Sequence, residues 1–524
     1  MRLRGIVLVV VGLALASLVV AGASEPRYGG TFRCAIASEP GTLDMQMSTG
    51  VNEGTIACNV FQGLFSFDAD FAPQPELATG LELDPSGTVA TIHIRQGVFF
   101  HNGQEMKAED VVASLTRWGQ YGATAKALWS LVTAVNALDE YTVVLTLSQP
   151  FGPLTTYLAN DVGGPFIYPK ALVEAAGNKP LPPASYIGTG PYRFVEWKSG
   201  DYILLERYDR FVSLDTPSSG HAGKKAAYFD KLQFFFVPDD NARLVGIQAG
   251  TYDYVVDIPN DLLASVQGDK NILPITINHP PIYPIALVNN KQGICTNIGI
   301  KQAMLTALDM SDIMLAGYGD PQFWSLNPSY FAPGIRWYTP DEGLGLYDVA
   351  DPAKARTMAE AAGYKGEPIR IIVAGDMTAQ YNQAVVVTSQ LVAAGFNVSL
   401  QVYDKATFMA RRNAKDNPEW ELAFSFYSTT PDPSLVLMLS PTYAGWWDSP
   451  RIQVLRTEVN QLTDFGARYA KWQEIMDLWY EEIPALKFGD AFQLHLIRSD
   501  IGGGYGTSQH VVMIHGYFYN LWED

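Results

Sequence analysis

The sequence predicts an α/β fold divided into two lobes. Its 524 residues exceed what one hydrophobic core supports, because single cores stop growing at roughly 250 to 300 residues. Between residues 301 and 402, stretches with helical spacing alternate with short apolar strands, which is typical of a largely parallel sheet covered by helices. Just before them, residues 280–290 hold three prolines and an apolar run, and this composition predicts a stiff strand that crosses between the lobes.

The hydrophobic pattern predicts the other elements in chain order. We expect strands at 28–37, 92–94, 98–100, 192–197, 201–208, 232–237, 369–373, 398–402 and 422–426, and helices at 55–65, from 108 onward, and at 241–248, 301–315, 353–362, 383–394 and 467–482. The helix that begins at Ala108 has a clear start signal, because Glu109 and Asp110 in its first turn suit the helix dipole.

The first 23 residues resemble a secretory signal peptide. Arg2 and Arg4 precede an apolar run, and the small residues Ala21, Gly22 and Ala23 fit a cleavage site. A membrane anchor is the alternative, although the run is short for the roughly 20 residues that a spanning helix needs. No cysteine follows the run directly, so we expect a soluble product without a lipid anchor.

Composition and charge narrow the class of protein. The 54 acidic and 36 basic side chains give a net charge of -18, which disfavours nucleic acid and anionic membranes as partners. An apolar content of 48% with 17% charged residues disfavours disorder. The three cysteines, Cys34, Cys58 and Cys295, allow one disulfide bridge at most, and three buried free thiols are the alternative.

The motifs of common enzymes and metal sites are absent from the sequence. It has no G-x-S-x-G, H-E-x-x-H or C-x-x-C motif and no Walker-type phosphate loop. Its seven histidines are scattered, and none has metal-ligand spacing to a neighbour. We therefore expect no catalytic residues, no metal and no cofactor.

The strand-and-turn stretch AFSFYSTTPDP, residues 423–433, is the main candidate for a binding site. A short apolar strand ends there in a polar turn with two prolines. Ligands of open α/β sheets bind beyond the carboxyl ends of the strands, although core packing followed by a plain loop is the competing interpretation. The candidates that follow from this placement are Phe426, Tyr427, Ser428, Thr429 and Asp432.

Two further pairs of residues could contribute to a binding site. Arg411 or Arg412 could hold a ligand carboxylate, since a guanidinium binds carboxylates bidentately, while solvated surface arginines are the alternative. Trp446 and Trp447 form an aromatic pair in a loop, and either could pack in the core instead.

Residues 91–118, TIHIRQGVFFHNGQEMKAEDVVASLTRW, closely resemble the signature of the family 5 extracellular solute-binding proteins of bacterial ABC importers, the dipeptide- and oligopeptide-binding type. Further landmarks follow in the expected order: EPGTLD at 39–44, GTGPYRFVEW at 188–197, AKARTMAEAAGY at 353–364 and PDP at 431–433. The resemblance implies a two-lobed periplasmic binding protein fold, type II-like, with an extra subdomain in the first lobe.

The resemblance also implies a division of the chain. The expected parts are a signal peptide at 1–23, a first lobe at 24–280 with a subdomain inserted at about 46–184, a second lobe at 281–488, and a return to the first lobe at 489–524. The chain would cross back between the lobes near 488–498. Trp324 and Tyr330 lie in a proline-rich loop that is near the cleft in similar proteins.

The implied function is that of a periplasmic binding protein, expected as a monomer, which captures a small solute and delivers it to an ABC permease in the inner membrane. A secreted hydrolase of peptides or glycans and a ligand-binding sensor subunit are the alternatives. A turnover assay would separate the hydrolase from a binding protein, and a neighbouring importer operon would argue against the sensor.

One position departs from the pattern of the peptide-binding relatives. There, an aspartate three residues before the Asp-Pro pair commonly binds the ligand's α-ammonium, and here that place holds Thr429. Asp432 is expected to cap local backbone amides instead. The resemblance therefore implies a ligand without an exposed ammonium: a blocked peptide, a modified amino acid, an opine-like conjugate, an oligosaccharide or an aromatic acid.

Overall fold

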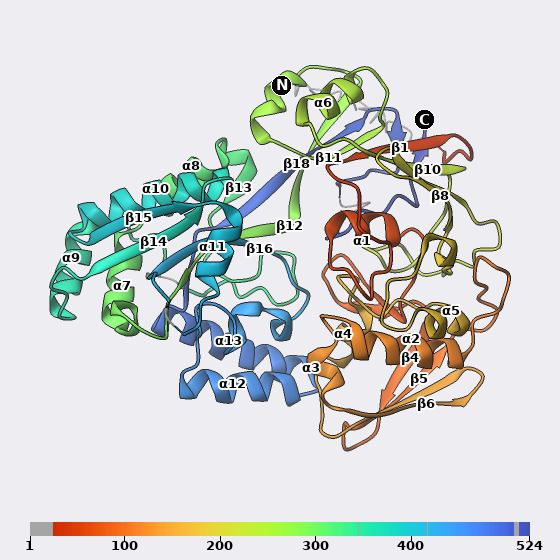
Figure 1. The fold of residues 1–524 in the computed structure, drawn as a ribbon, viewed down its shortest axis with the longest axis horizontal. Coiled ribbons are helices and arrows are strands. Elements are labelled where there is room, and N and C mark those ends of the chain that lie inside the picture. The colour runs from red at the N-terminus through yellow and green to blue at the C-terminus, as the bar shows by residue number, and fades with distance from the viewer. Residues whose placement is uncertain (1–24, 344, 417, 508–512) are drawn as a thin grey trace, which may run out of the picture.

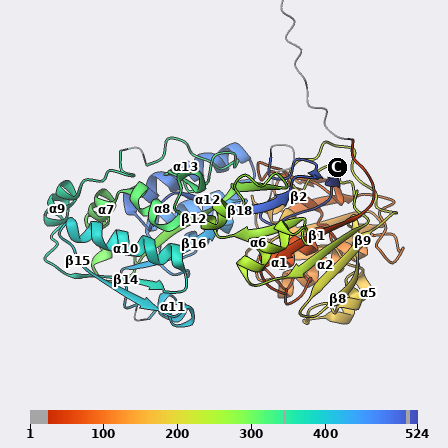
Figure 2. The same ribbon diagram turned by 90° about the horizontal axis from the view of Figure 1, so that it is seen from above.

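Figures 1 and 2 show two lobes side by side, joined by the strands β12 (Ile272–Val288) and β18 (Asp490–Arg498). This computed structural model describes residues 25–343, 345–416, 418–507 and 513–524. The expected signal peptide lies outside the described residues. Among the helices of the described part, none is long and apolar enough to cross a membrane.

One sheet of twelve strands runs through both lobes. Its main path is β15 (Asn397–Tyr403), β14 (Pro368–Ala374), β16 (Leu422–Ser428), β12, β18, β11 (Tyr254–Ile258), β1 (Thr31–Ile36), β10 (Lys231–Phe236), β9 (Tyr202–Arg207) and β8 (Tyr192–Lys198). The short strands β13 (Trp324–Ser325) and β17 (Ala485–Lys487) pair with β18 and β12. The two lobes are therefore joined by the hydrogen bonds of a shared sheet as well as by the covalent chain.

β12 changes partners along its length. Ile272 to Ile277 pair with β18, and beyond them Ile282 still pairs with β18 and Ile285 to Leu287 pair with β17, while Ile282 to Val288 gain β16 on the other edge. The register shifts between Ile277 and Ile282, at the prolines, which lack the N–H that a regular ladder needs. The crossing strand expected at 280–290 is thus the second half of a longer strand.

The second half of the chain combines parallel strands and helices, as the alternation predicted. β14 pairs in parallel with both β15 and β16, and α10 packs on β14 and β15. The helices of this region are α7 (Ile298–Ala307), α8 (Met310–Tyr318), α9 (Pro352–Ala361), α10 (Thr378–Ala393), α11 (Lys405–Arg412), α12 (Pro450–Gln461) and α13 (Phe465–Glu482).

The prediction of a single helix at 301–315 is wrong, because the structure has two helices, α7 and α8, in its place. Leu308 is extended, and the Asp309 carboxylate accepts a hydrogen bond from the Asp312 N–H at 3.0 Å. Asp309 therefore caps a new helix where the apolar spacing alone suggested continuity.

The first half of the chain adds a separate sheet, with the order β4 (Ala78–Leu83), β5 (Val89–Ile94), β7 (Thr142–Leu147) and β6 (Val132–Asp139). The helix α2 (Ala108–Tyr121) packs on β6, β7 and α5 (Lys170–Ala176), and it begins at Ala108 as predicted. The remaining helices and strands are α1 (Val51–Ala57), α3 (Lys126–Trp129), α4 (Leu154–Ala159), α6 (Asp240–Gln248), β2 (Phe65–Phe67), β3 (Pro73–Pro75), β19 (Ile501–Gly502) and β20 (Trp522–Glu523).

Two expectations for the first half are corrected. The helix expected at 55–65 is α1, which ends at Ala57, because the Asn59 side chain donates back to the Thr55 carbonyl at 2.8 Å and competes with the helical ladder. The strand expected at 98–100 is only an isolated bridge between Phe99 and Glu105.

All three cysteines are buried and unbridged. Of the two interpretations of the cysteine count, the structure agrees with free thiols.

Candidate ligand-binding site

The carboxyl end of β16 lies at the crossing between the lobes. β16 runs antiparallel to β12, and its last residue, Ser428, pairs with Ile282 at the point where β12 changes partners. Leu422 to Ser425 are buried, but Phe426 is 44% exposed and Ser428 is also exposed. The side chains of β16 therefore become exposed at the end of the strand that points toward the first lobe.

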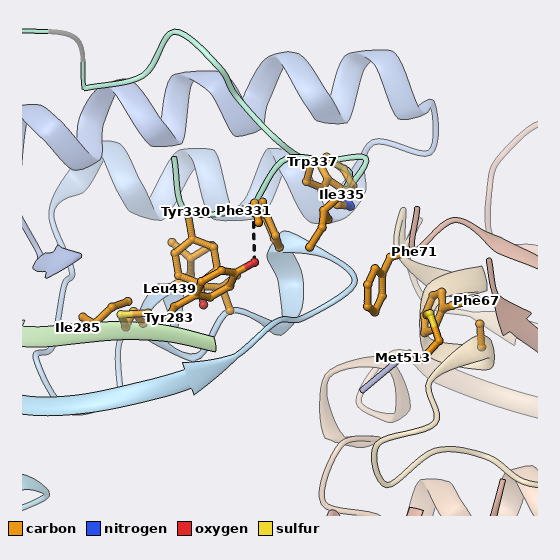
Figure 3. Close-up of a cluster of buried hydrophobic side chains, with 14 of the residues drawn as sticks. Phe67, Phe71, Tyr283, Ile285, Tyr330, Phe331, Ile335, Trp337, Leu439 and Met513 are labelled. Atoms are coloured by element: carbon orange, nitrogen blue, oxygen red, sulfur yellow. Dashed lines mark hydrogen bonds between the residues drawn. The ribbon is translucent and has the colours of Figure 1, made fainter. Parts of the chain in front are cut away.

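A turn of the first lobe carries Asp70 and Phe71 against the second lobe. The Arg336 N–H donates to the Asp70 carbonyl at 3.1 Å. Figure 3 shows Phe71 lying opposite Ile335 and Trp337, at the boundary between the two lobes. An aromatic side chain from each lobe thus borders the region beyond β16.

Thr429 is 3% exposed, and its hydroxyl is used within the protein. It hydrogen-bonds to the Pro281 carbonyl at 2.8 Å and to the Tyr283 hydroxyl at 2.9 Å. The Tyr283 hydroxyl also accepts from the Ala332 N–H at 3.3 Å (Figure 3). These bonds tie the turn after β16 to β12 and leave Thr429 little hydrogen-bonding capacity for a ligand.

Asp432 is fully buried, and Arg468 on α13 binds its carboxylate through two hydrogen bonds of 2.7 and 2.8 Å. The same carboxylate accepts from the Ser434 N–H at 2.9 Å, so the expected capping of local backbone amides is present. The Ser434 hydroxyl also donates to it at 2.7 Å, so with four bonds inside the protein Asp432 holds the turn in place.

The two neighbouring arginines lie in different surroundings. Arg411 is paired with Glu419 at 3.0 Å, and both side chains are largely exposed. Arg412 is only 7% exposed, and its Nε donates a hydrogen bond to the Asn413 side chain at 3.2 Å. Within the part of the chain that the structure describes, Arg412 forms no ion pair with a carboxylate. Its guanidinium lies 5.7 Å from the ring centre of Tyr443.

Tyr443 connects Arg412 with the candidate Tyr427. The hydroxyls of Tyr427 and Tyr443 lie 3.1 Å apart. Burial raises the pKa of Tyr427, and the neighbouring Tyr443 raises that pKa further, so the phenol stays neutral. A buried cation and two phenol hydroxyls near the end of β16 can together bind an anionic group.

The tryptophan pair is part of the core. Trp446 is 6% exposed and packs on Trp420, with ring centres 5.6 Å apart. Trp447 is 3% exposed, and its Nε1 donates to Glu482 at 2.5 Å. Neither ring is open to a ligand in this arrangement.

The two aromatic candidates of the proline-rich loop also have internal partners. Tyr330 is 2% exposed and packs against Tyr283, with ring centres 5.2 Å apart. Trp324 is half-buried, and its Nε1 donates to the Gly319 carbonyl at 3.0 Å. The structure thus brings Phe426, Tyr427 and Ser428 to the boundary of the lobes and keeps Tyr330 in the core beneath it.

Sequence reasoning missed several residues at the site: Phe71, Tyr283, Tyr443 and Arg468. Tyr283, Tyr443 and Arg468 bond candidates that lie at least 16 residues away in the sequence, and Phe71 comes from the other lobe. Only the aromatic content of the chain hinted at the tyrosines.

The comparisons with known proteins agree with this fold. The profile of the bacterial extracellular solute-binding proteins, family 5 (middle), matches residues 72–446. A probable peptide ABC transporter periplasmic-binding protein of Sinorhizobium fredii, y4tO, is 28% identical over 460 residues, which are 84% of this chain and 85% of that protein.

Two solved structures share the architecture. CtaP, an ABC transporter substrate-binding protein of Listeria monocytogenes, matches with a TM-score of 0.81 at 22% identity, over 95% of this chain and 100% of its own. AgaA of A. tumefaciens R10, solved in complex with agropinic acid, matches with a TM-score of 0.72 at 21% identity, over 94% and 99%. The predicted two-lobed periplasmic binding protein fold is thereby confirmed. The family profile covers well over half of the chain, and we conclude that this protein belongs to the family 5 bacterial extracellular solute-binding proteins.

Proposed function

We propose that the protein captures a carboxylate-bearing small solute between its lobes and delivers it to an ABC permease. The observation that carries the proposal is that Arg412, a residue only 7% exposed, has no ion-pair partner among the described residues. An unpaired buried charge is costly, and a ligand carboxylate would supply the missing partner. Arg411 already has Glu419 and is the weaker candidate.

Aromatic groups would supply the apolar part of the affinity. Phe426 exposes 44% of its surface at the end of β16, whereas Phe71, at the lobe boundary, is 1% exposed and already packed. Burying such surface contributes roughly 25 cal/mol per Å² before the costs of ordering the ligand. Tyr427 and Ser428 would add hydrogen bonds that orient the solute.

The solute is proposed to lack a free ammonium at this point. Thr429 is neutral and bonded to Pro281 and Tyr283, and the carboxylate of Asp432 is occupied by Arg468. The ligand should therefore carry a carboxylate and lack a free ammonium at this point. Candidates are opine-like conjugates, blocked peptides, modified amino acids, oligosaccharides with an acidic group and aromatic acids. Among relatives, y4tO is named a peptide transporter component and AgaA was solved with agropinic acid.

The protein is further proposed to act in the periplasm as a monomer, after cleavage near Ala23. In this proposal, residues 24–280 and 489–524 move as one lobe, with a subdomain at about 46–184, and 281–488 as the other. Intact mass of the periplasmic protein would test the cleavage, and light scattering would test the monomer.

The deciding experiment is mass spectrometry of small molecules released when the purified protein is denatured. The expected result is a stoichiometric carboxylate-bearing solute that the native protein retains unchanged. Release of hydrolysed fragments from peptide or glycan pools would favour the hydrolase instead. Recovery of free-amino dipeptides would contradict the proposed ligand class.

A further inference from the structure

Cys58, Asp161 and His221 form a polar group in the interior of the first lobe. One potential metal-ligand atom from each residue lies within 4.8 Å of the other two. All three residues are more than nine-tenths buried. They line a cavity of about 30 Å³, which has room for about one water molecule. We propose that these three side chains bind a Zn²⁺ ion, independently of the solute site.

The hydrogen bonding of His221 prepares one ring nitrogen as a ligand. Its Nε2 lies 3.0 Å from the backbone carbonyl of His515, which can only accept, so Nε2 carries a proton. Its Nδ1 lies 3.2 Å from an Asp161 carboxylate oxygen. A ring N–H bonded to a carbonyl, with the second nitrogen facing the metal, is the usual arrangement of a metal-binding histidine.

The separation of the nitrogen and oxygen atoms fits a tetrahedral ion. Zn–N and Zn–O bonds of roughly 2.0 Å at the tetrahedral angle separate the two ligand atoms by roughly 3.3 Å. The observed separation of His221 Nδ1 and Asp161 Oδ2 is 3.2 Å. The Cys58 sulfur completes three protein ligands, and the adjoining cavity gives space for a water as the fourth.

The charges also favour a divalent ion with an affinity for sulfur. A Cys58 thiolate and an Asp161 carboxylate carry two negative charges, which Zn²⁺ neutralises inside the protein. Lys225 borders the same cavity, but its ammonium is already paired with Glu76 at 3.1 Å. Thiolate and imidazole ligands select zinc over magnesium or calcium.

The site would join segments that are distant in the sequence. Cys58 follows directly after α1, Asp161 follows α4, and the His221 backbone N–H donates to the Phe67 carbonyl at 2.9 Å. The bond from His221 to the His515 carbonyl adds the C-terminal part of the chain. A bound ion would therefore stabilise the first lobe, since metal binding to the folded state adds to the free energy of unfolding.

The alternative is a metal-free ion pair, in which a doubly protonated His221 donates to Asp161 and Cys58 remains a thiol. The two states predict different metal contents and different spectra. Sequence reasoning expected no metal site, because these three residues have no ligand spacing along the chain.

The test uses untagged full-length mature protein, stripped with a chelator and dialysed against buffered Zn²⁺, with metal content measured by plasma mass spectrometry. We expect about one zinc per chain, and at least about tenfold weaker binding in Cys58→Ser and in His221→Gln. Cys34→Ser and Cys295→Ser are matched controls, since both are buried free thiols outside the group, and they should bind zinc as the wild type does.

Cobalt provides a readout that needs no variant. Co²⁺ bound by Cys58 should give a thiolate-to-cobalt charge-transfer band and the visible spectrum of a tetrahedral site, and zinc should displace it. Zinc should also raise the thermal unfolding midpoint of the wild type and of both controls. A wild type that binds no zinc above buffer, a cobalt spectrum without a thiolate band, or unchanged affinity in a folded Cys58→Ser variant would overturn the proposal.

Discussion

Arg468 and Asp432 form a bidentate ion pair beneath the turn that follows β16, with hydrogen bonds of 2.8 and 2.7 Å. Both side chains are at most 5% exposed. The Arg468 Nε also donates to the Val459 carbonyl at 2.8 Å, so the pair links the turn to the end of α12 and the start of α13. The turn at the candidate site is thereby fixed to the helices of the second lobe.

Replacing Asp432 with Asn should destabilise the protein strongly. The substitution leaves a buried guanidinium without its counter-charge, and breaking such a pair costs about 3 to 5 kcal/mol. Urea unfolding monitored by tryptophan fluorescence measures the effect. Arg451→Ala is the control, because the Arg451–Glu481 pair is more than half exposed and exposed pairs contribute little. Equal losses in both variants would contradict the assigned role of Asp432.

Arg412→Ala should weaken binding of the carboxylate solute by at least about tenfold, since a hydrogen bond to a charged group contributes about 1.5 to 3 kcal/mol. Arg411→Ala should change affinity little, because Arg411 is already paired with Glu419 on the surface. Calorimetry with the solute released from the native protein compares the two variants. Circular dichroism checks that each is folded. A larger loss in Arg411→Ala would reverse the assignment.

Solute binding should close the lobes. The described arrangement already has direct contacts between them, with the Gly152 N–H 2.7 Å from the Asn460 carbonyl and the Arg336 N–H 3.1 Å from the Asp70 carbonyl. We expect these contacts alone to be too weak to keep the lobes closed without a ligand. The free protein should therefore open by a hinge motion about the crossing strands. Small-angle scattering should show a smaller radius of gyration at saturating solute. An unchanged profile with verified binding would refute this hinge.

Local pattern predicted much of the fold. The strand expected at 192–197 is β8, and the helix expected at 467–482 is most of α13. The spacing of apolar residues gave the wrong helix boundaries where a capping side chain sets them, as Asp309 does at the start of α8. It also failed where turns interrupt an apolar run, as after Ala57.

The site was harder to predict, because the polar side chains there form hydrogen bonds with partners that are distant in the sequence. The turn at Asp432 was recognisable, but nothing in the sequence pairs it with Arg468. The same holds for Thr429, whose hydroxyl is bonded to Pro281, and for Trp447, whose indole is bonded to Glu482. Tertiary contacts, which no spacing rule encodes, decide which polar groups remain for a ligand.

Thr429→Asp should create affinity for free-amino peptides that the wild type lacks. In the wild type, the Thr429 hydroxyl is neutral and bonded to Pro281 and Tyr283, so an α-ammonium would find only a neutral partner there. A charge-assisted hydrogen bond contributes about 1.5 to 3 kcal/mol against about 0.5 to 1.5 for a neutral one, which corresponds to a gain on the order of tenfold in the variant.

The measurement for Thr429 is calorimetry with matched free and N-acetylated peptides on both proteins, with Thr429→Asn as the neutral control. The wild type and Thr429→Asn should not prefer the free amine, and only Thr429→Asp should, because only the carboxylate supplies the charge. Tyr283 can still donate to an aspartate at this position, so the turn keeps one of its two ties to β12. If the wild type already binds free di- or tripeptides with submicromolar affinity and acetylation abolishes it, recognition of the ammonium comes from another group, and the proposed ligand class is wrong.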